Sequence, residues 1–136
     1  MTNPPAPSVS PYLFYADVER AARFMQDAFG FSLVFTSPDP NGGLAHAQLA
    51  HGSGLIMVGH AGGGGLGLVK SAATLPALHA AVYVYVDDVD AHCARAREAG
   101  MKVMIEPSDQ PWGDRMYCGT DPEGQFWMFG KKLTGG

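Results

Sequence analysis

Apolar residues along this chain show two kinds of spacing, one typical of helices and one typical of strands. The two kinds of spacing follow one another in the same order in two separate segments. Residues 14–38 and 84–108 each begin with a short apolar run, continue with apolar residues three and four positions apart, and end in alternation. Spacing of three and four is typical of an amphipathic helix, whereas alternation is typical of a half-buried strand. The pattern therefore predicts a strand, a helix and a strand in each of two similar units.

The ends of both predicted helices carry the expected residues. Asp17 and Asp88 can cap the helix N-termini, and Gly30 and Gly100 can end the helices in a left-handed conformation. The apolar stripes are Val18, Ala21, Ala22, Met25 and Phe29 in the first helix, and Val89, Cys93 and Ala96 in the second. The second helix is expected to be one residue shorter than the first.

Three strands are expected after each helix, separated by turn signals such as the sequence DPEG at 121–124. The predicted ranges are 31–37, 44–50, 54–60, 102–106, 114–120 and 125–131. The fold class is therefore α+β, with two tandem βαβββ modules at 8–61 and 78–132 in a single domain, 8–132. Residues 1–7, rich in proline, are predicted to be a flexible leader, and the glycine-rich residues 62–77 a mobile linker or lid.

The linker contains a glycine run followed by Lys70 and Ser71, which resembles a phosphate-binding loop. Val69 stands where such a loop needs glycine, and Pro76 lies within what should be the following helix. Nucleotide binding at this place is therefore not expected.

Composition narrows the class of partner. Charged residues make up 16% of the chain and the net charge is −4, so there is no basic surplus for binding nucleic acid. No apolar run approaches the ~20 residues of a membrane helix, and the N-terminus does not have the pattern of a secretion signal. We expect a cytoplasmic protein with Cys93 and Cys118 as free, buried thiols.

The duplicated pattern, together with three motifs, resembles a known superfamily over residues 8–132. The motifs are AREAG at 96–100, EPSDQPWGDRMY at 106–117 and DPEGQFWMF at 121–129. This combination resembles the vicinal oxygen chelate superfamily, which includes glyoxalases, bleomycin-resistance proteins and extradiol dioxygenases. The resemblance implies curled mixed sheets around a cavity, a small-molecule ligand and a homodimer.

Enzymes of that superfamily hold a divalent metal with four side chains. The resemblance places three of these positions at Ser10, Ala81 and Met128, and the fourth within Leu55–Val58, where Met57 is favoured. Zn²⁺, Mn²⁺ and Fe²⁺ are bound by imidazole nitrogen and carboxylate oxygen, which none of these residues supplies. The five histidines form no HxH or HExxH motif. No metal and no cofactor is therefore expected.

Alternation along the strands predicts which side chains face the cavity. The inward set comprises Tyr12, Phe14, Tyr83, Tyr85, Phe126 and Met128, with His79 at the edge of the cavity. The opposite set, which includes Tyr15, Trp127 and Phe129, should pack beneath the helices. The aromatic face can hold a planar ligand, or its rings can simply fill the space.

Three further residues lie around the predicted seventh strand. Arg115 and Tyr117 share one face of it; if they point inward, Arg115 can hold an anionic group. The alternative is a salt bridge from Arg115 to Asp109, Asp114 or Glu106. Trp112, in the preceding turn, can stack on a ligand or cover the core. With these three, the predicted ligand-binding set has nine residues: Tyr12, Phe14, Tyr83, Tyr85, Trp112, Arg115, Tyr117, Phe126 and Met128.

The leading hypothesis is a metal-independent protein that binds a planar or aromatic small molecule, as in drug sequestration. The sequence shows no Ser-His-Asp or Cys-His arrangement for nucleophilic catalysis. The alternative is a lyase, isomerase or ring-cleaving dioxygenase that uses a metal or a general acid such as Tyr83, Tyr85 or His79. A third possibility is an inert or regulatory protein in which the rings form only core.

Overall fold

Two units of the same topology follow one another in the computed structural model, which describes residues 7–62 and 69–134. The first contains β1 (Tyr12–Tyr15), α1 (Val18–Phe29), β2 (Ser32–Pro38), β3 (Leu44–His51) and β4 (Gly54–His60). The second contains β5 (Ala81–Tyr85), α2 (Val89–Ala99), β6 (Lys102–Asp109), β7 (Asp114–Thr120) and β8 (Phe126–Lys132). The predicted α+β fold of tandem βαβββ units is confirmed.

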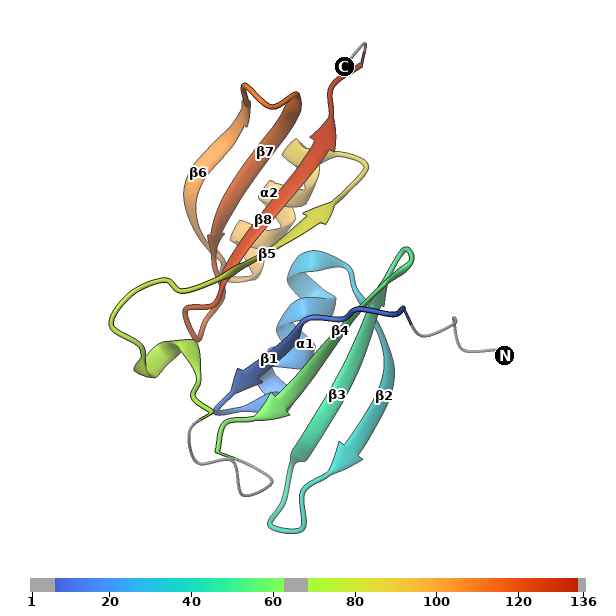
Figure 1. The fold of residues 1–136 in the computed structure, drawn as a ribbon, viewed down its shortest axis with the longest axis vertical. Helices are drawn as coiled ribbons and strands as arrows, with labels where there is room; N and C mark the ends of the chain where they lie inside the picture. Colours follow the sequence, from blue (N-terminus) through green and yellow to red (C-terminus); the bar gives the residue numbers. More distant parts are fainter. Residues whose placement is uncertain (1–6, 63–68, 135–136) are drawn as a thin grey trace.

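Each unit forms one open, mixed, four-stranded sheet. The strand orders are β1-β4-β3-β2 and β5-β8-β7-β6, and in both sheets the first strand runs parallel to the last while the other neighbours are antiparallel. Figure 1 shows the two sheets one above the other, with β1 and β5 on the sides that face each other. The edges of β1 and β5 therefore form the boundary between the units.

Both helices begin and end where capping chemistry predicts. The Oδ1 atoms of Asp17 and Asp88 accept hydrogen bonds from backbone N–H groups three residues later, at 3.0 and 3.1 Å. Gly30 and Gly100 follow the helices with φ of 76° and 117°, a conformation that strongly favours glycine. Within residues 7–62 and 69–134, no helix combines the length and apolar character needed to cross a membrane.

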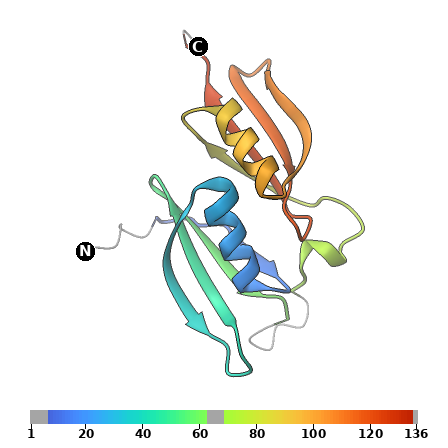
Figure 2. The same cartoon turned by 180° about the vertical axis from the view of Figure 1, so that it is seen from behind.

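The helices cover the same side of the two sheets, as the reverse view in Figure 2 shows. Phe29, at the end of α1, lies 4.9 Å from the ring of Trp127 and 4.7 Å from the ring of Phe129, both on β8 of the other unit. The core is therefore continuous between the units. Cys93 and Cys118 are free and buried, as predicted.

A turn between β7 and β8 fastens the second unit to the first. The buried carboxylate of Asp121 accepts hydrogen bonds from the Tyr15 hydroxyl at 2.5 Å and from Trp127 Nε1 at 3.0 Å. The carboxylate of Glu123 accepts from the backbone N–H groups of Ala16 and Asp17 at 2.7 and 3.0 Å. These bonds fix the position of the β7–β8 turn against the start of α1.

The C-terminal part of the predicted linker is attached to the β7–β8 turn. Residues 63–68, with most of the glycine run, lie outside the described residues. Beyond them, the buried Ser71 hydroxyl donates to Glu123 Oε1 at 2.6 Å and caps the short 3-10 helix η2 (Ala72–Thr74). The chain is therefore held against the second unit before it enters β5.

His92 joins α2 to α1 and to β7. Its Nε2–H donates to the carbonyl oxygen of Phe29 at 3.0 Å, because a carbonyl can only accept, and its Nδ1 therefore accepts from the Tyr117 hydroxyl at 2.6 Å. Burial lowers the pKa of His92, since the charged imidazolium loses hydration there. The neutral histidine is the form that fits this position.

We predict that Tyr15→Phe lowers the free energy of unfolding by about 1–3 kcal/mol, because Asp121 loses a donor while it stays buried. Urea-induced unfolding followed by circular dichroism measures this loss. Tyr12→Phe, which removes the same atom from an exposed ring, is the matched control and should cost less than about 1 kcal/mol. Equal losses in the two variants would contradict the role given to Asp121.

We also predict that the stability contributed by His92 is lost as pH falls. The folded-state pKa lies below the unfolded value of about 6.5, so the unfolded chain binds a proton first and stability decreases below about pH 6.5. Urea unfolding between pH 7.5 and 5.5 should show a weaker pH dependence in His92→Gln than in the unmodified protein. His60→Gln, a change at an exposed histidine, should keep the original dependence. An unchanged dependence in His92→Gln would show that His92 is not the titrating group.

Candidate ligand-binding site

The side of each sheet away from its helix, here called the uncovered face, carries the same arrangement in both units. Tyr12 on β1 pairs in register with Met57 on β4, and Tyr83 on β5 pairs with Met128 on β8. The register extends these pairs into two rows: Tyr12, Met57, Gln48 and Phe35 across the first sheet, and Tyr83, Met128, Cys118 and Ile105 across the second. The duplication thus places a tyrosine beside a methionine at equivalent positions.

A glycine on the neighbouring strand sets the position of each tyrosine ring. A Cβ atom added to Gly59 would lie 2.7 Å from a ring carbon of Tyr12, and one added to Gly130 would lie 2.5 Å from the Tyr83 hydroxyl oxygen. Each ring therefore occupies the space that a side chain would take on the adjacent strand. Gly59 and Gly130 were not identified from the sequence, although their spacing of 71 residues repeats that of the two tyrosines.

The strand alternation placed most of the predicted ligand-binding residues on the uncovered face. Tyr15, Trp127 and Phe129 are buried on the helix side, as predicted, and the residues that alternate with them point the other way. On the uncovered side lie Tyr12, Phe14, Tyr83, Tyr85, Phe126 and Met128. Their binding of a ligand remains a prediction.

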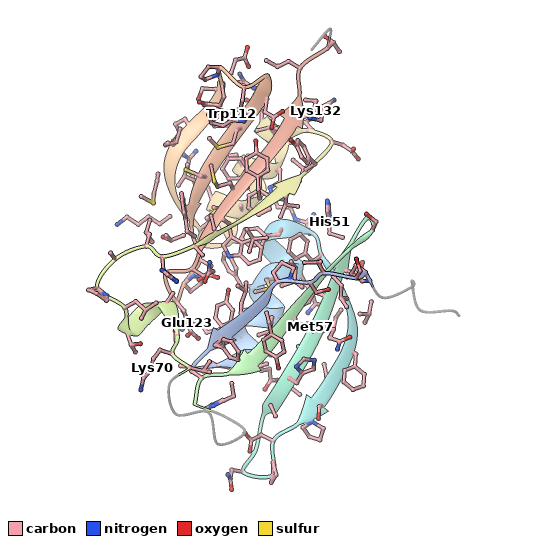
Figure 3. The ribbon with its side chains drawn as sticks, in the orientation of Figure 1. His51, Met57, Lys70, Trp112, Glu123 and Lys132 are labelled. Carbon is pink, nitrogen blue, oxygen red and sulfur yellow. The ribbon has the colours of Figure 1, made fainter. Side chains whose placement is uncertain are left out.

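Trp112 lies at the same face and does not cover the core. Its side chain in the β6–β7 turn is 57% exposed, and its Nε1 lies 3.4 Å from the Tyr83 hydroxyl oxygen. Figure 3 labels Trp112 and Lys132 at the end of the second unit that lies away from the first unit. The indole is therefore free to contact a molecule bound beside Tyr83.

Arg115 and Tyr117, included in the ligand-binding set on the condition that they point inward, do not point inward. Tyr117 pairs in register with Phe129, so it lies on the helix side and is fully buried. Arg115, two residues earlier, shares that side and binds both carboxylate oxygens of Asp90 on α2 at 2.9 Å. It also reaches Asp109 at 3.1 Å, one of the salt-bridge partners considered from the sequence. Arg115 is thus held by carboxylates of the protein itself.

The structure adds Asp114 to the site. This residue is 2% exposed, and its Oδ2 accepts hydrogen bonds from the hydroxyls of Tyr83 at 2.7 Å and Tyr85 at 2.9 Å. The bond from Tyr83 is the main reason that the pKa of Asp114 is lowered. Desolvation, together with that bond, raises the pKa of Tyr83 to about 12. Asp114 is therefore ionised, and Tyr83 protonated, at neutral pH.

A hollow of about 630 Å³ lies at the boundary between the units, next to these tyrosines. Tyr83 and Tyr85 line one side, and Val9 and the β3–β4 turn line the other. His51, labelled at the tip of that hairpin in Figure 3, donates from Nε2 to the carbonyl oxygen of Tyr85 at 2.8 Å. This volume is within the range usual for small-molecule pockets.

A smaller hollow, of about 290 Å³, lies beside β1. Tyr12, Phe14 and Phe126 line it together with the chain that leads into β5. His79 also lines it. The aromatic residues predicted from alternation therefore border two hollows.

The four positions that the fold would use for a divalent metal do not offer suitable donors. Met57 and Met128 supply thioethers, Ser10 a hydroxyl and Ala81 a methyl group. None of these is an imidazole, a carboxylate or a thiolate, the side-chain donors that hold divalent zinc, manganese and iron in proteins. Across residues 7–62 and 69–134, no group of three or more His, Cys, Asp or Glu side chains is arranged to hold a metal ion. The residues present therefore do not fit such a metal.

Comparison with known proteins identifies relatives of this chain. A solved structure of TioX from Micromonospora sp. ML1 is 32% identical, with a TM-score of 0.72 over 93% of this chain and 100% of that chain. The uncharacterized protein Rv0887c of Mycobacterium tuberculosis is 32% identical over 132 residues, 93% of this chain and 75% of the relative. FosX from Listeria monocytogenes, a fosfomycin resistance protein solved with Mn(II) and sulfate, is similar in fold alone, at 12% identity and a TM-score of 0.69 over 94% of this chain and 91% of that chain.

A family model gives the assignment directly. The model of the Glyoxalase/Bleomycin resistance protein/Dioxygenase superfamily matches residues 8–129, which include both βαβββ units. The match agrees with the paired sheets and with the relatives described above. The chain belongs to the glyoxalase/bleomycin resistance protein/dioxygenase superfamily.

Proposed function

We propose that this protein binds a planar or aromatic small molecule without a metal ion, and that it holds the molecule at the boundary between the two units. The observation that carries the proposal is the set of exposed rings beside the larger hollow. Tyr83 and Tyr85, which line this hollow, are 36% and 48% exposed, and Trp112, whose Nε1 lies 3.4 Å from the Tyr83 hydroxyl oxygen, is 57% exposed. Rings that only filled the core of this chain would be buried, so these rings are available for contact with another molecule.

The contact area is large enough for useful affinity. Burying about 150 Å² of a flat ligand against the rings contributes roughly 4 kcal/mol at ~25 cal/mol per Å². Aromatic pairs add to this when they stack with an offset or meet edge to face. With a few hydrogen bonds, the sum supports micromolar binding after the entropy cost of association.

Binding followed by sequestration is compatible with the family, whose description includes bleomycin resistance proteins. Metal-dependent chemistry is the alternative, because FosX, a protein of similar fold, was solved with Mn(II). The side chains at Ser10, Met57, Ala81 and Met128 favour binding without a metal over that alternative. Tyr83 is also a poor general acid, because a pKa of about 12 means that it holds its proton tightly at neutral pH.

We predict that a planar aromatic probe binds and that Tyr83→Ala weakens binding at least tenfold, because one face of the contact is removed. Titration calorimetry with 8-anilinonaphthalene-1-sulfonate and with proflavine measures the affinity. Leu33→Ala is the control, since Leu33 is an exposed apolar side chain on the helix side of the distant β2 strand and its loss should leave affinity unchanged. Circular dichroism verifies that both variants are folded.

The same samples test the role of metal. Affinity should be the same with and without EDTA, and elemental analysis of protein purified without a chelator should show no stoichiometric metal. Stoichiometric metal together with activity on a glutathione adduct of methylglyoxal or on a catechol would replace the binding proposal with the enzyme alternative. Absence of binding to either probe, with no thermal stabilisation, would favour an inert or regulatory role.

We further propose that the protein forms a homodimer through its uncovered faces, because apolar side chains there remain exposed in one chain. Phe35 and Ile105 are 51% and 48% exposed at the outer ends of the two rows.

We predict a dimer at micromolar concentration in analytical ultracentrifugation, and a shift toward monomer in Ile105→Glu. Leu33→Glu places the same charge on the helix side of β2 and should leave the dimer intact. A monomer at all concentrations would rule out this assembly.

A further inference from the structure

The hydroxyl groups of Tyr83 and Tyr85 both donate a hydrogen bond to the same carboxylate oxygen. Their oxygen atoms lie 2.7 and 2.9 Å from Asp114 Oδ2, an atom that can only accept when the carboxylate is ionised. A phenolic hydroxyl group has one hydrogen, so each of these oxygens presents only lone pairs to any other partner. Trp112 Nε1, at 3.4 Å from the Tyr83 oxygen, already approaches as a donor. The two hydroxyls therefore act as acceptors toward a bound molecule.

Negative charge lies directly beneath this surface. Asp114 is 2% exposed, and the hydrogen bonds from both tyrosines lower its pKa, which keeps it ionised. The faces of the tyrosine rings carry the negative part of the aromatic quadrupole. The carboxylate, the lone pairs and the ring faces all favour a positively charged partner.

A cation of the protein already lies at one of these rings. Lys132 Nζ is 5.2 Å from the centroid of the Tyr85 ring, within the distance of a cation–π contact. Lys132 is an exposed residue near the end of β8, and it pairs in register with Asp114. The contact places a cation of the protein at the Tyr85 ring, and it makes Lys132 a competitor for any cationic ligand.

On the equivalent face of the first unit, a histidine is the partner of the tyrosine hydroxyl. The Tyr12 hydroxyl lies 3.1 Å from Nδ1 of His46, and Nε2 of the same imidazole lies 3.0 Å from Gln48 Nε2. Burial lowers the pKa of His46, which favours the neutral imidazole. The two faces share their tyrosines but differ in charge, so any preference for a cation belongs to the second unit.

We propose that the ligand class is a planar aromatic cation, which stacks against Tyr85 and Trp112 and donates N–H groups to the hydroxyl oxygens of Tyr83 and Tyr85. This inference rests on the proposed binding function and adds the charge of the ligand to it. The cation is stabilised by Asp114, which accepts hydrogen bonds from both of these hydroxyls. Anionic aromatic molecules are disfavoured by the same carboxylate.

Two probes of opposite charge test the proposal in fluorescence titrations. Proflavine is a planar cation with N–H donors, and 8-anilinonaphthalene-1-sulfonate is an aromatic anion. Proflavine should bind at least tenfold more tightly than the anion. Asp114→Asn should weaken proflavine at least tenfold and leave binding of the anion unchanged or stronger. Asp27→Asn makes the same change in net charge at an exposed position on α1, and it should alter neither affinity.

A second variant has the opposite expected sign and does not disturb a buried group. Lys132→Gln should strengthen proflavine binding two- to fivefold, because it removes the competing cation from Tyr85. Lys131→Gln is the matched control: it removes the same charge from the adjacent residue, which points to the other side of β8, and it should have little effect. If Asp114→Asn does not fold, this pair decides the question.

The outcomes separate the two proposals. Tighter binding of the anion, or proflavine binding that is unchanged in folded Asp114→Asn and in Lys132→Gln, overturns the charge preference and leaves the binding function in place. Failure of both probes to bind at millimolar concentration overturns the binding function itself. Weakening by Asp27→Asn equal to that by Asp114→Asn would show a general charge effect and would also overturn the proposed site.

Discussion

Hydrogen bonding to the β7–β8 turn is the constraint on which the rest of this structure depends. Asp121 accepts from Tyr15 of the first unit and from Trp127 of its own unit, and Glu123 holds the start of α1 and the linker residue Ser71. A carboxylate as buried as Asp121 is costly unless its oxygens are satisfied, so the turn can sit at this place only when both units are correctly positioned. The hollows at the boundary exist because this turn fixes β1 relative to β5.

Duplication then gives the two units equal geometry but not equal chemistry. Tyr12 over Gly59 and Tyr83 over Gly130 have the same position on their sheets, because both tyrosines belong to a strand that runs parallel to the last strand of its unit. The polar partner of each hydroxyl comes from a different strand position, His46 in one unit and Asp114 in the other. A symmetric scaffold can therefore carry two surfaces of different charge.

Local patterns predicted the helices and most strand faces, because caps, glycines and alternation act within a few residues. The failure at Arg115 and Tyr117 has a definite cause: the face of β7 depends on its register with β8, which the intervening turn determines. Thr120 pairs with Phe126 across that turn, and this pairing places Tyr117 on the helix side. Asp90, the main partner of Arg115, lies 25 residues away in sequence and could not be found from spacing. Asp114 was missed as a site residue for the same reason, because its face of β7 also depends on the register between β7 and β8.

The buried carboxylate and the exposed rings have separate physical roles at the second face. For the proposed ligand, contact area with Tyr85 and Trp112 would supply most of the binding free energy, but it discriminates weakly among flat molecules of similar size. Asp114 cannot add much contact, since it is almost fully buried, yet its charge acts on a molecule at the two tyrosine hydroxyls, whose oxygens lie 2.7 and 2.9 Å from its Oδ2 atom. The two tyrosine hydroxyls make this arrangement stable, because they satisfy the carboxylate without neutralising it. Affinity from the rings and selectivity from the charge can therefore change independently, by substitution at the surface or beneath it.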